Sequence, residues 1–375
     1  MTNIYLIRHA EAEGNLYRIA QGQYNSLITD RGHRQIAALE KRFAGVRIDG
    51  VYSSDLYRTC VTAGAIYIPR RLPLRRMPAL REICVGDWEQ KTWGEIARSD
   101  GEQMQNFTAH LDRWHVAGAE TPEQVRDRVL AAVRQIAREN QGKTVAVFSH
   151  GCAIRILLAT LQGYSIAQVG GTPLGANTAV SLLQAEGEDL RVVFRDDVSH
   201  LTEELTRKRT GRQPRPLDPG LFFLPAELPR QGEWLRTVAA AAWADSGDSR
   251  AFDAGTLLRE AETRPTVVGQ LEGTPVGLLQ LHPEKEAALG RGWLSLYCVD
   301  RDYRGQGYGV QLLGQAVQHY RALGRDTLCV ALTAKNQTAR RFFTDYGFRD
   351  SGETDDRGRQ VLCKRIAFAE LPDFS

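Results

Sequence analysis

The sequence lacks any apolar run of the length that a membrane-spanning helix needs, about 18 residues or more. Met1, Thr2 and Asn3 lead directly into an apolar, β-favouring stretch, so we expect no signal peptide before the first strand. The overall composition, with 42% hydrophobic and 25% charged residues, is typical of a globular protein in water. We therefore predict a cytoplasmic protein that makes no contact with a membrane.

Cysteine is also scarce, and its spacing is uninformative for metal binding. The six cysteines form no CxxC pair, which favours reduced thiols in a cytoplasm over disulfides or a zinc site. We expect all six to behave as small buried apolar side chains; they are Cys60, Cys84, Cys152, Cys298, Cys329 and Cys363.

Net charge is nearly absent, at +3, and the small excess is concentrated in one segment. Residues 1–205 hold 24 basic and 24 acidic side chains, and residues 221–375 hold 19 and 20. Residues 206–220 hold five basic residues, one acidic residue, three prolines and two glycines, which is typical of an exposed linker. Since neither flanking region is basic, we expect no nucleic-acid partner.

At 375 residues the chain exceeds the size of one ordinary hydrophobic core. The length and the charge distribution together predict two domains, over residues 1–205 and 221–375, joined by a basic linker over residues 206–220.

The first domain alternates apolar strands with amphipathic helices. Strands are expected at residues 2–7, 50–53 and 144–149. Helices are expected after Thr29, after Ser53 and after Thr121, and Thr92 with Glu95 forms a further capping box. This alternation predicts a mostly parallel sheet covered by helices, a three-layer α/β/α arrangement.

Charged and imidazole side chains follow two of these strands. Arg8 and His9 come directly after the first strand, and His150 follows the strand at residues 144–149. Ligands of such sheets bind beyond the carboxyl ends of the strands. Phosphoryl transfer needs a nucleophile in line, positive charge around the phosphoryl oxygens and an acid for the departing alkoxide. We interpret His9 as the nucleophile, with Arg8, Arg58 and His150 around the oxygens. Glu82 or another acid would protonate the leaving group. Glu82 then requires a raised pKa.

Five segments in this order resemble the histidine phosphatase superfamily, in its phosphoglycerate-mutase-like branch. They are Leu6–Asn15 with its Arg-His pair, Asn25–Gln35, Ser53–Thr59, Leu80–Glu82 with Gly86 and Trp88, and Ser149–Gly151. The resemblance implies the phosphoglycerate-mutase-like fold and a phosphohistidine intermediate on His9 that water resolves. It implies catalytic roles for His9, Glu82 and His150, and substrate-binding roles for Arg8, Asn15, Gln21, Gly22, Arg58 and Gly151. It implies neither a metal nor another cofactor for this domain.

Ala10, Gln23, Asn25 and Leu27 depart from the family pattern, the last three in the loop that shapes the substrate mouth. Glu82 and His150 are only 68 positions apart, shorter than the cap insertion common in mutases of the family, which favours a phosphatase over a mutase. The expected substrate is a small phosphorylated metabolite.

The second domain contains a glycine-rich turn between a strand and a helix. The strand at residues 293–299 runs into Arg304-Gly305-Gln306-Gly307-Tyr308-Gly309, and a helix with an apolar face follows up to Gly324. A turn of this kind at a helix N-terminus presents backbone N–H groups to a pyrophosphate. Further expected elements are a strand at 221–225, helices at 233–244 and 252–263, a hairpin at 266–281 turning at Glu272-Gly273, a strand at 327–332 and a helix at 336–346.

This turn and Asn336–Phe348 resemble the GNAT acetyltransferase family over about 150 residues. The resemblance implies the mixed α/β acyl-CoA N-acyltransferase fold, acetyl-CoA as cosubstrate and a small amine as acceptor. The cofactor-binding residues it implies are Val299, Arg304, Gly305, Gln306, Gly307, Tyr308, Gly309 and Asn336. Phe343 stands where a tyrosine often protonates the departing thiolate, and Tyr346 lies on a neighbouring face of the helix.

Two hypotheses follow for the whole chain. One is a bifunctional enzyme, with a phosphatase and an acetyltransferase acting on related metabolites. The other is a phosphatase whose GNAT-like domain only binds acyl-CoA, as a sensor, or has a structural role. The sequence shows no metal-ligand spacing for either domain, so we expect no metal.

Overall fold

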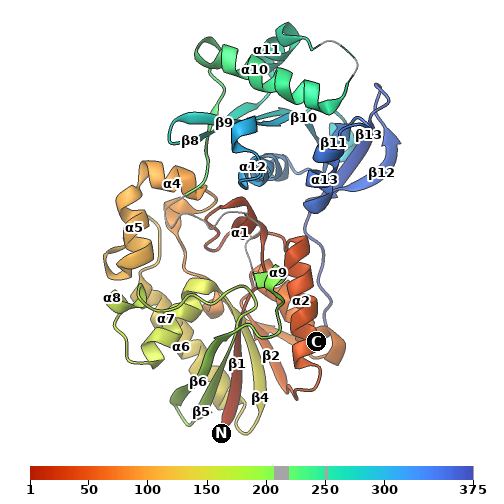
Figure 1. The fold of residues 1–375 in the computed structure, drawn as a ribbon. Helices are drawn as coiled ribbons and strands as arrows, with labels where there is room; N and C mark the ends of the chain where they lie inside the picture. Colours follow the sequence, from red (N-terminus) through yellow and green to blue (C-terminus); the bar gives the residue numbers. More distant parts are fainter. Residues whose placement is uncertain (207–218, 249, 251, 375) are drawn as a thin grey trace. The chain divides into compact units, whose positions relative to one another are not determined.

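The computed structural model describes residues 1–206, 219–248, 250 and 252–374 (Figure 1). The chain forms two compact units. The N-terminal unit comprises Met1–Lys91, Ile96–Lys208 and Glu370–Ser375, and the C-terminal unit comprises Thr92–Glu95 and Arg209–Ala369. Most of the expected linker, residues 207–218, lies outside the described residues. The last residues of the chain, which the predicted range gave to the second domain, group with the N-terminal unit.

The N-terminal unit is built on a six-stranded mixed sheet in the order β3-β2-β4-β1-β5-β6. The first four of these strands are mutually parallel, and β5 and β6 extend the sheet in antiparallel fashion. The strands are β1 Thr2–Arg8, β2 Gly50–Ser53, β3 Leu74–Arg76, β4 Thr144–Ser149, β5 Val180–Glu186 and β6 Asp189–Asp197. Because β2, β4 and β1 are adjacent and parallel, their carboxyl ends meet at one edge of the sheet.

Helices cover the sheet as the alternating pattern predicts. The helices α2 and α3 pack together over one apolar cluster that includes Ile7, Val51 and Phe148, and α6 packs with α7 (Figure 1). The helices of this unit are α1 Glu13–Tyr17, α2 Asp30–Phe43, α3 Tyr57–Arg70, α5 Gly101–Ala109, α6 Pro122–Glu139, α7 Gly151–Leu161, α8 Ile166–Val169 and α9 Glu203–Thr206, and α4 Trp93–Ser99 belongs to this unit from Ile96 on.

Three predicted helix starts are confirmed by their hydrogen bonds. Thr29 accepts the N–H of Gly32 at the start of α2, and Thr121 forms a capping box with Gln124 at the start of α6. Thr92 and Glu95 exchange the same pair of bonds before α4. These caps define the first residue of each helix. In α6 the cap therefore also determines the position of every later side chain along the helix.

The C-terminal unit is a seven-stranded mixed sheet in the order β12-β13-β11-β10-β9-β8-β7, in which β10 and β11 are parallel. Its strands are β7 Phe222–Pro225, β8 Thr266–Leu271, β9 Thr274–His282, β10 Arg291–Val299, β11 Thr327–Leu332, β12 Arg349–Thr354 and β13 Gln360–Arg365. Its helices are α10 Leu228–Ser246, α11 Ala254–Thr263, α12 Tyr308–Ala322 and α13 Gln337–Asp345. The predicted hairpin turns at Glu272-Gly273, and α10 begins five residues before the expected position.

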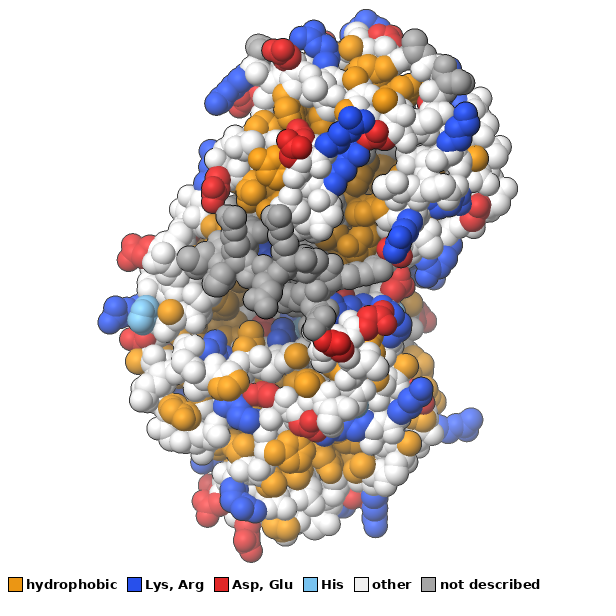
Figure 2. Space-filling view, in the orientation of Figure 1, with side chains coloured by type: hydrophobic (Ala, Val, Ile, Leu, Met, Phe, Trp, Pro, Cys, Tyr) orange, Lys and Arg blue, Asp and Glu red, His pale blue; other side chains and the backbone are white. Residues whose placement is uncertain are grey.

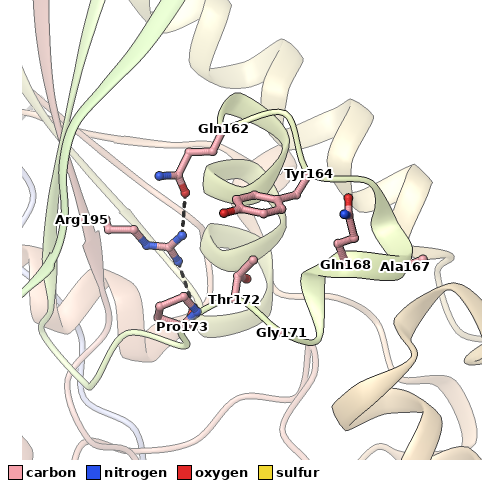
Figure 3. Close-up of a pocket in the computed structure, with 8 residues that line it drawn as sticks. All are labelled: Gln162, Tyr164, Ala167, Gln168, Gly171, Thr172, Pro173 and Arg195. Carbon is pink, nitrogen blue, oxygen red and sulfur yellow. Dashed lines mark hydrogen bonds between the residues drawn. The ribbon is translucent and has the colours of Figure 1, made fainter.

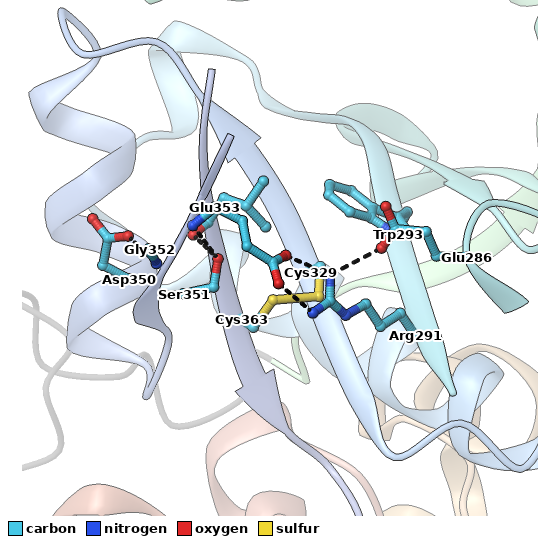
Figure 4. Close-up of a disulfide and its surroundings, with 10 residues drawn as sticks. Glu286, Arg291, Trp293, Cys329, Asp350, Ser351, Gly352, Glu353 and Cys363 are labelled. Atoms are coloured by element: carbon cyan, nitrogen blue, oxygen red, sulfur yellow. Dashed lines mark hydrogen bonds and ion pairs between the residues drawn. A yellow bond between two sulfur atoms is a disulfide. The ribbon is translucent and has the colours of Figure 1, made fainter. Parts of the chain in front are cut away.

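The prediction that all six cysteines are reduced is wrong for one pair. Cys329 on β11 and Cys363 on β13 are bonded as a disulfide, with a Cα–Cα distance of 4.3 Å (Figure 4). The two residues are direct register partners on neighbouring antiparallel strands, a relation that spacing along the chain does not reveal. Cys60, Cys84, Cys152 and Cys298 are free thiols.

Basic and acidic side chains are interspersed on the visible face of each unit, with apolar patches between them (Figure 2). Among the described helices, none combines the length and the apolar character needed to cross a membrane.

Candidate active site

His9 lies at the sheet edge where β1 ends. Its ring is almost fully buried, and Nδ1 lies 2.7 Å from the carbonyl oxygen of Ala10. Because that oxygen can only accept, Nδ1 carries the hydrogen and Nε2 keeps its lone pair. Burial, followed by the charges of Arg58 and Arg8, holds the pKa of His9 well below its usual value. A neutral imidazole with a free Nε2 is the form that attacks phosphorus.

His150 caps the N-terminus of α7, directly after β4, and its ring centroid lies 5.3 Å from that of His9. Its Nε2 lies 2.9 Å from Oγ of Ser54, which also accepts the N–H of Leu56. If the Ser54 hydroxyl donates to Nε2, the hydrogen of the neutral ring is on Nδ1. Burial is also the main reason that the pKa of His150 lies well below its usual value.

Two arginines, the buried Arg58 and the partly exposed Arg8, are anchored beside these rings. Arg8 donates to the carbonyl of Gly175 at 2.5 Å, and Arg58 donates to the carbonyls of Gly22 and Tyr24 at 2.7 and 2.8 Å. Burial lowers the pKa of Arg58 to about 10, which still leaves it charged at neutral pH. Gly151 makes room for Arg8, because a Cβ there would lie 3.1 Å from the guanidinium carbon.

Three buried side-chain nitrogens of these residues lack a partner among the described residues. Nε of Arg8, Nε of Arg58 and Nδ1 of His150 have no hydrogen-bond partner within the described structure. A buried polar group left unpaired costs about 1–3 kcal/mol, so such a group calls for an explanation. Two cationic forks and an imidazole donor fit the oxygens of a phosphoryl group.

Glu82 is held against the N-terminus of α7. Its carboxylate oxygens accept the backbone N–H groups of Cys152, Ala153 and Ile83 at 3.0, 2.9 and 3.0 Å. Its charge acts on both Arg8 and Arg58. The structure thus brings Glu82 to the same edge as His9, His150 and the two arginines.

The predicted residues in α1 and in the loop that follows it hold this part of the chain in place. Oδ1 of Asn15 accepts the N–H of Ala12 and an amide hydrogen of Asn177, and Oε1 of Gln21 accepts the hydroxyl of Ser26. The carbonyl of Gly22 accepts a hydrogen bond from Arg58. Gly22 has a positive φ of 40°, a conformation that glycine adopts more readily than other residues.

Several functional neighbours were missed in the sequence. Ser54 bonds His150, the side chain of Asn177 donates to the carbonyl of His9, and Glu89 accepts the N–H groups of Gln23 and Tyr24. Burial raises the pKa of Glu89. Position after strand β2 could have singled out Ser54. The others lie far along the chain from the residues they contact, so only the fold brings them together.

A hollow of about 530 Å³ on the N-terminal unit contains none of the predicted site residues (Figure 3). Arg195 borders it and is already engaged, since it donates to Oε1 of Gln162 and to the carbonyl of Pro173. The unpartnered donors lie elsewhere, so we place the chemistry at the His9 edge. The lining residues are Gln162, Tyr164, Ala167, Gln168, Gly171, Thr172, Pro173 and Arg195.

In the C-terminal unit, β10 and β11 part beyond their last paired residues, Leu294 and Val330. Val299, further along β10, is paired with Gly277 of β9. The turn that follows reaches α12 through Gly305 and Gly307, whose φ values of 72° and 86° favour glycine. The strand opening and the glycine turn at the start of α12 fit an extended pantetheine chain and its pyrophosphate.

Other predicted residues of this region have partners within the chain. Nε of Arg304 donates to the carbonyl of Val299 at 2.9 Å, and its Nη1 pairs with Asp245 at 2.7 Å. Gln306 donates to the carbonyl of Asp302, and Asn336 caps α13 by accepting the N–H of Ala339. Tyr308 is buried at the start of α12, and Phe342 lies against Gly309.

Phe343, at the position of the expected proton donor, is buried against the rings of Tyr297 and Phe348. The hydroxyl of Tyr297 donates to the carbonyl of Gly309. Within the described chain, no cluster of three or more His, Cys, Asp or Glu side chains could hold a metal ion.

Comparison with known proteins matches each half to a family. Residues 4–198 match the histidine phosphatase superfamily, branch 1, and residues 229–348 match the acetyltransferase (GNAT) family.

Three relatives illustrate the first match. A metal-independent phosphoserine phosphatase of Arabidopsis thaliana is 31% identical over 206 residues, covering 54% of this chain and 84% of the relative. The "Probable phosphoglycerate mutase GpmB" of Proteus mirabilis is 30% identical over 44% of this chain and 76% of the relative. The solved structure of Bacillus stearothermophilus YhfR is 30% identical with a TM-score of 0.52, over 53% of this chain and 99% of that one.

Proposed function

The chain belongs to branch 1 of the histidine phosphatase superfamily, and from this premise we propose that it hydrolyses small phosphomonoesters through a phosphohistidine on His9. The observation that carries the proposal is the set of three buried, unpartnered nitrogens of Arg8, Arg58 and His150 beside the neutral ring of His9. A phosphoryl group satisfies all three donors while Nε2 of His9 faces the phosphorus atom.

In the first step Nε2 of His9 attacks phosphorus and the bond from phosphorus to the ester oxygen breaks. Arg8, Arg58 and His150 bind the three non-bridging oxygens, where negative charge accumulates. Glu82 gives its proton to the departing alkoxide, so the product leaves as an alcohol.

In the second step water attacks the phosphorus of phosphohistidine and the P–N bond breaks. Glu82, now ionised, accepts the proton of the water, and inorganic phosphate leaves. Both steps use groups of this chain alone, and the similarity to a phosphatase described as metal-independent is consistent with that.

A mutase is the alternative, because a second substrate hydroxyl could take the phosphoryl group instead of water. The short interval of 68 positions between Glu82 and His150 leaves little room for a cap that excludes water, which favours hydrolysis.

For the C-terminal unit we propose acetyl transfer from acetyl-CoA to a small amine. The family match, the opening between β10 and β11 and the glycine turn before α12 support binding of an acyl-CoA. The alternative is a unit that binds acyl-CoA and senses it without transfer. The buried Phe343 favours this alternative, because a phenyl side chain has no proton to give to the departing CoA thiolate. We also propose that the protein acts in the cytoplasm on soluble metabolites.

A panel of phosphomonoesters tests the first activity most directly. We expect phosphate release from at least one of phosphoserine, sugar phosphates and nucleotides, and loss of release in His9→Ala. Retained turnover in His9→Ala would remove the proposal, and transfer between the hydroxyls of a phosphoglycerate without net phosphate release would replace it with a mutase.

Calorimetry with acetyl-CoA on the full chain tests the second activity. If acetyl-CoA does not bind, the C-terminal unit has a structural role. If acetyl-CoA binds but no amine is acetylated, the unit is a sensor. If acetyl-CoA does not change the phosphatase rate, the hypothesis that the C-terminal unit regulates the N-terminal unit is rejected.

A further inference from the structure

Side chains from other parts of the N-terminal unit hold the segment that carries Glu82, by hydrogen bonds to its backbone carbonyl groups. The four consecutive carbonyls of residues 79–82 each accept a hydrogen bond from a side chain. The hydroxyl of Ser149, at the end of β4, donates to Leu80 at 2.8 Å. The other three, those of Ala79, Arg81 and Glu82, accept from one guanidinium, that of Arg128 on α6, at 3.0, 2.7 and 2.9 Å.

Arg128 uses all five of its N–H donors. Two of its nitrogens donate to Glu120, with Nε to Oε1 at 2.7 Å and Nη2 to Oε2 at 2.8 Å. The remaining hydrogens go to the three carbonyls. Only the planar guanidinium of arginine offers five donors in a fixed fork, so a lysine cannot reproduce this set.

Glu120 holds the segment from its other side. Its Oε2 also accepts the backbone N–H of Cys84 at 2.9 Å and the side-chain amide of Gln23 at 3.3 Å. Burial opposes ionisation of Glu120, but the bonds from Arg128 and Cys84 outweigh it and keep the pKa of Glu120 below its usual value. Both side chains of the pair are about four-fifths buried, which limits screening by water.

We infer that Arg128 and Glu120 are a positioning pair that sets the Glu82 carboxyl at the ester oxygen of the substrate. The pair forms hydrogen bonds to the backbone before and after Glu82, while backbone N–H groups at the N-terminus of α7 donate to its carboxylate. The inference rests on the proposed function, because it assigns a task to Glu82 as the acid of that reaction. Neither Arg128 nor Glu120 contacts the reacting atoms in this role.

The leaving group distinguishes this role from a general structural one. An alkoxide leaving group needs the proton of Glu82, whereas p-nitrophenolate leaves without one. A misplaced acid therefore slows the first step, formation of phosphohistidine, with alkyl phosphates and spares that step with p-nitrophenyl phosphate. A general loss of structure slows both substrates alike.

The test compares Arg128→Lys with wild type on an alkyl phosphate that the panel identifies and on p-nitrophenyl phosphate. We expect kcat/KM, which reports the step that forms phosphohistidine, to fall at least about 10-fold on the alkyl phosphate and to change less than about 3-fold on the aryl ester. Glu82→Gln should show the same selectivity more strongly. Arg138→Lys is the matched control, because Arg138 lies on the same helix and donates to the exposed Glu188 at 3.4 Å.

Equal loss on both esters in Arg128→Lys, or no loss on either, would overturn the inference. Should Arg128→Lys fail to fold, Glu120→Gln supplies the same comparison, since it removes the charge and keeps the shape. A wild-type protein that hydrolyses neither ester contradicts the proposed function itself, and that outcome is distinct from an active wild type whose variants lack selectivity.

Discussion

At the scale of single residues, the site combines neutral imidazoles with fixed cations. The pKa values of His9 and His150 are lowered first by burial and then by the neighbouring arginines. Arg8 and Arg58 are each fixed by backbone carbonyls, and the buried Nε of each has no partner among the described residues. The charge that binds phosphate also keeps the nucleophile deprotonated.

The lowered pKa of His9 predicts how stability depends on pH. Unfolded histidines gain protons below about pH 6.5, whereas His9 and His150 stay neutral in the fold, so the unfolded state binds more protons. Stability should therefore fall as pH decreases below about 6.5, with a limiting slope of about 1.4 kcal/mol per pH unit for each histidine. Urea unfolding between pH 7.5 and 5.5 measures the slope.

In that titration His9→Gln should lower the slope, while substitution of the exposed His110 by Gln should leave it unchanged. An equal slope in wild type and His9→Gln contradicts the assignment of a neutral His9.

Gly151 gives a second prediction at this scale. In Gly151→Ala the new methyl meets the guanidinium of Arg8 at 3.1–3.3 Å, so Arg8 must shift by a few tenths of an ångström. Small displacements in a phosphoryl-transfer site are costly, and we expect kcat/KM to fall on the order of 10-fold. Gly101, likewise the first residue of a helix, has open space around it, so Gly101→Ala is the matched control. Wild-type kinetics in Gly151→Ala would contradict the close packing of Arg8.

At the scale of helices and strands, the sequence predicts elements that bury one face. The helix α6 has a capping box and a regular apolar face, so both its start and its orientation could be predicted. By contrast, β3 has three residues, Leu-Arg-Arg, and every residue of β12 is exposed. Without alternation of apolar and polar side chains, neither strand has a recognisable pattern.

The disulfide between β11 and β13 predicts four free thiols in the unfolded, unreduced protein and six after reduction. Closing a loop of 34 positions should stabilise the C-terminal unit by about 4 kcal/mol. Cys363→Ser should lower the melting temperature of that unit, whereas Cys84→Ser, at a free and half-exposed cysteine, should not. Six reactive thiols before reduction would contradict the pairing.

At the scale of the whole molecule, the features that the sequence could not predict depend on contacts between residues far apart in the chain. The motifs around His9, Arg58 and His150 could be recognised because each follows a strand or begins a helix, whereas Glu82 lies between two short 3-10 helices, Pro78–Leu80 and Gly86–Trp88. The positioning pair could not, since Arg128 is 46 residues from Glu82 and meets it only through the fold. The linker composition separates two domains but does not reveal that the last residues pack in the N-terminal unit.

That C-terminal segment gives a prediction for the whole chain. Phe374 packs edge to face on Tyr67 with centroids 6.0 Å apart, and the hydroxyl of Tyr67 donates to the carbonyl of Pro372. Phe374→Ala should destabilise the N-terminal unit by about 1 kcal/mol. We expect the thermal inactivation of the phosphatase to begin at a lower temperature. Phe368→Ala, in the C-terminal unit, is the control, and equal inactivation of both variants would contradict this role for the segment.

The central claim is that His9 carries the phosphoryl group. Rapid acid-free quenching during turnover of a ³²P-labelled phosphomonoester, followed by peptide mapping, tests it directly. The account predicts an acid-labile label on the peptide that contains His9, absent from His9→Ala. Turnover without any label, or a label on a different residue, would contradict the account.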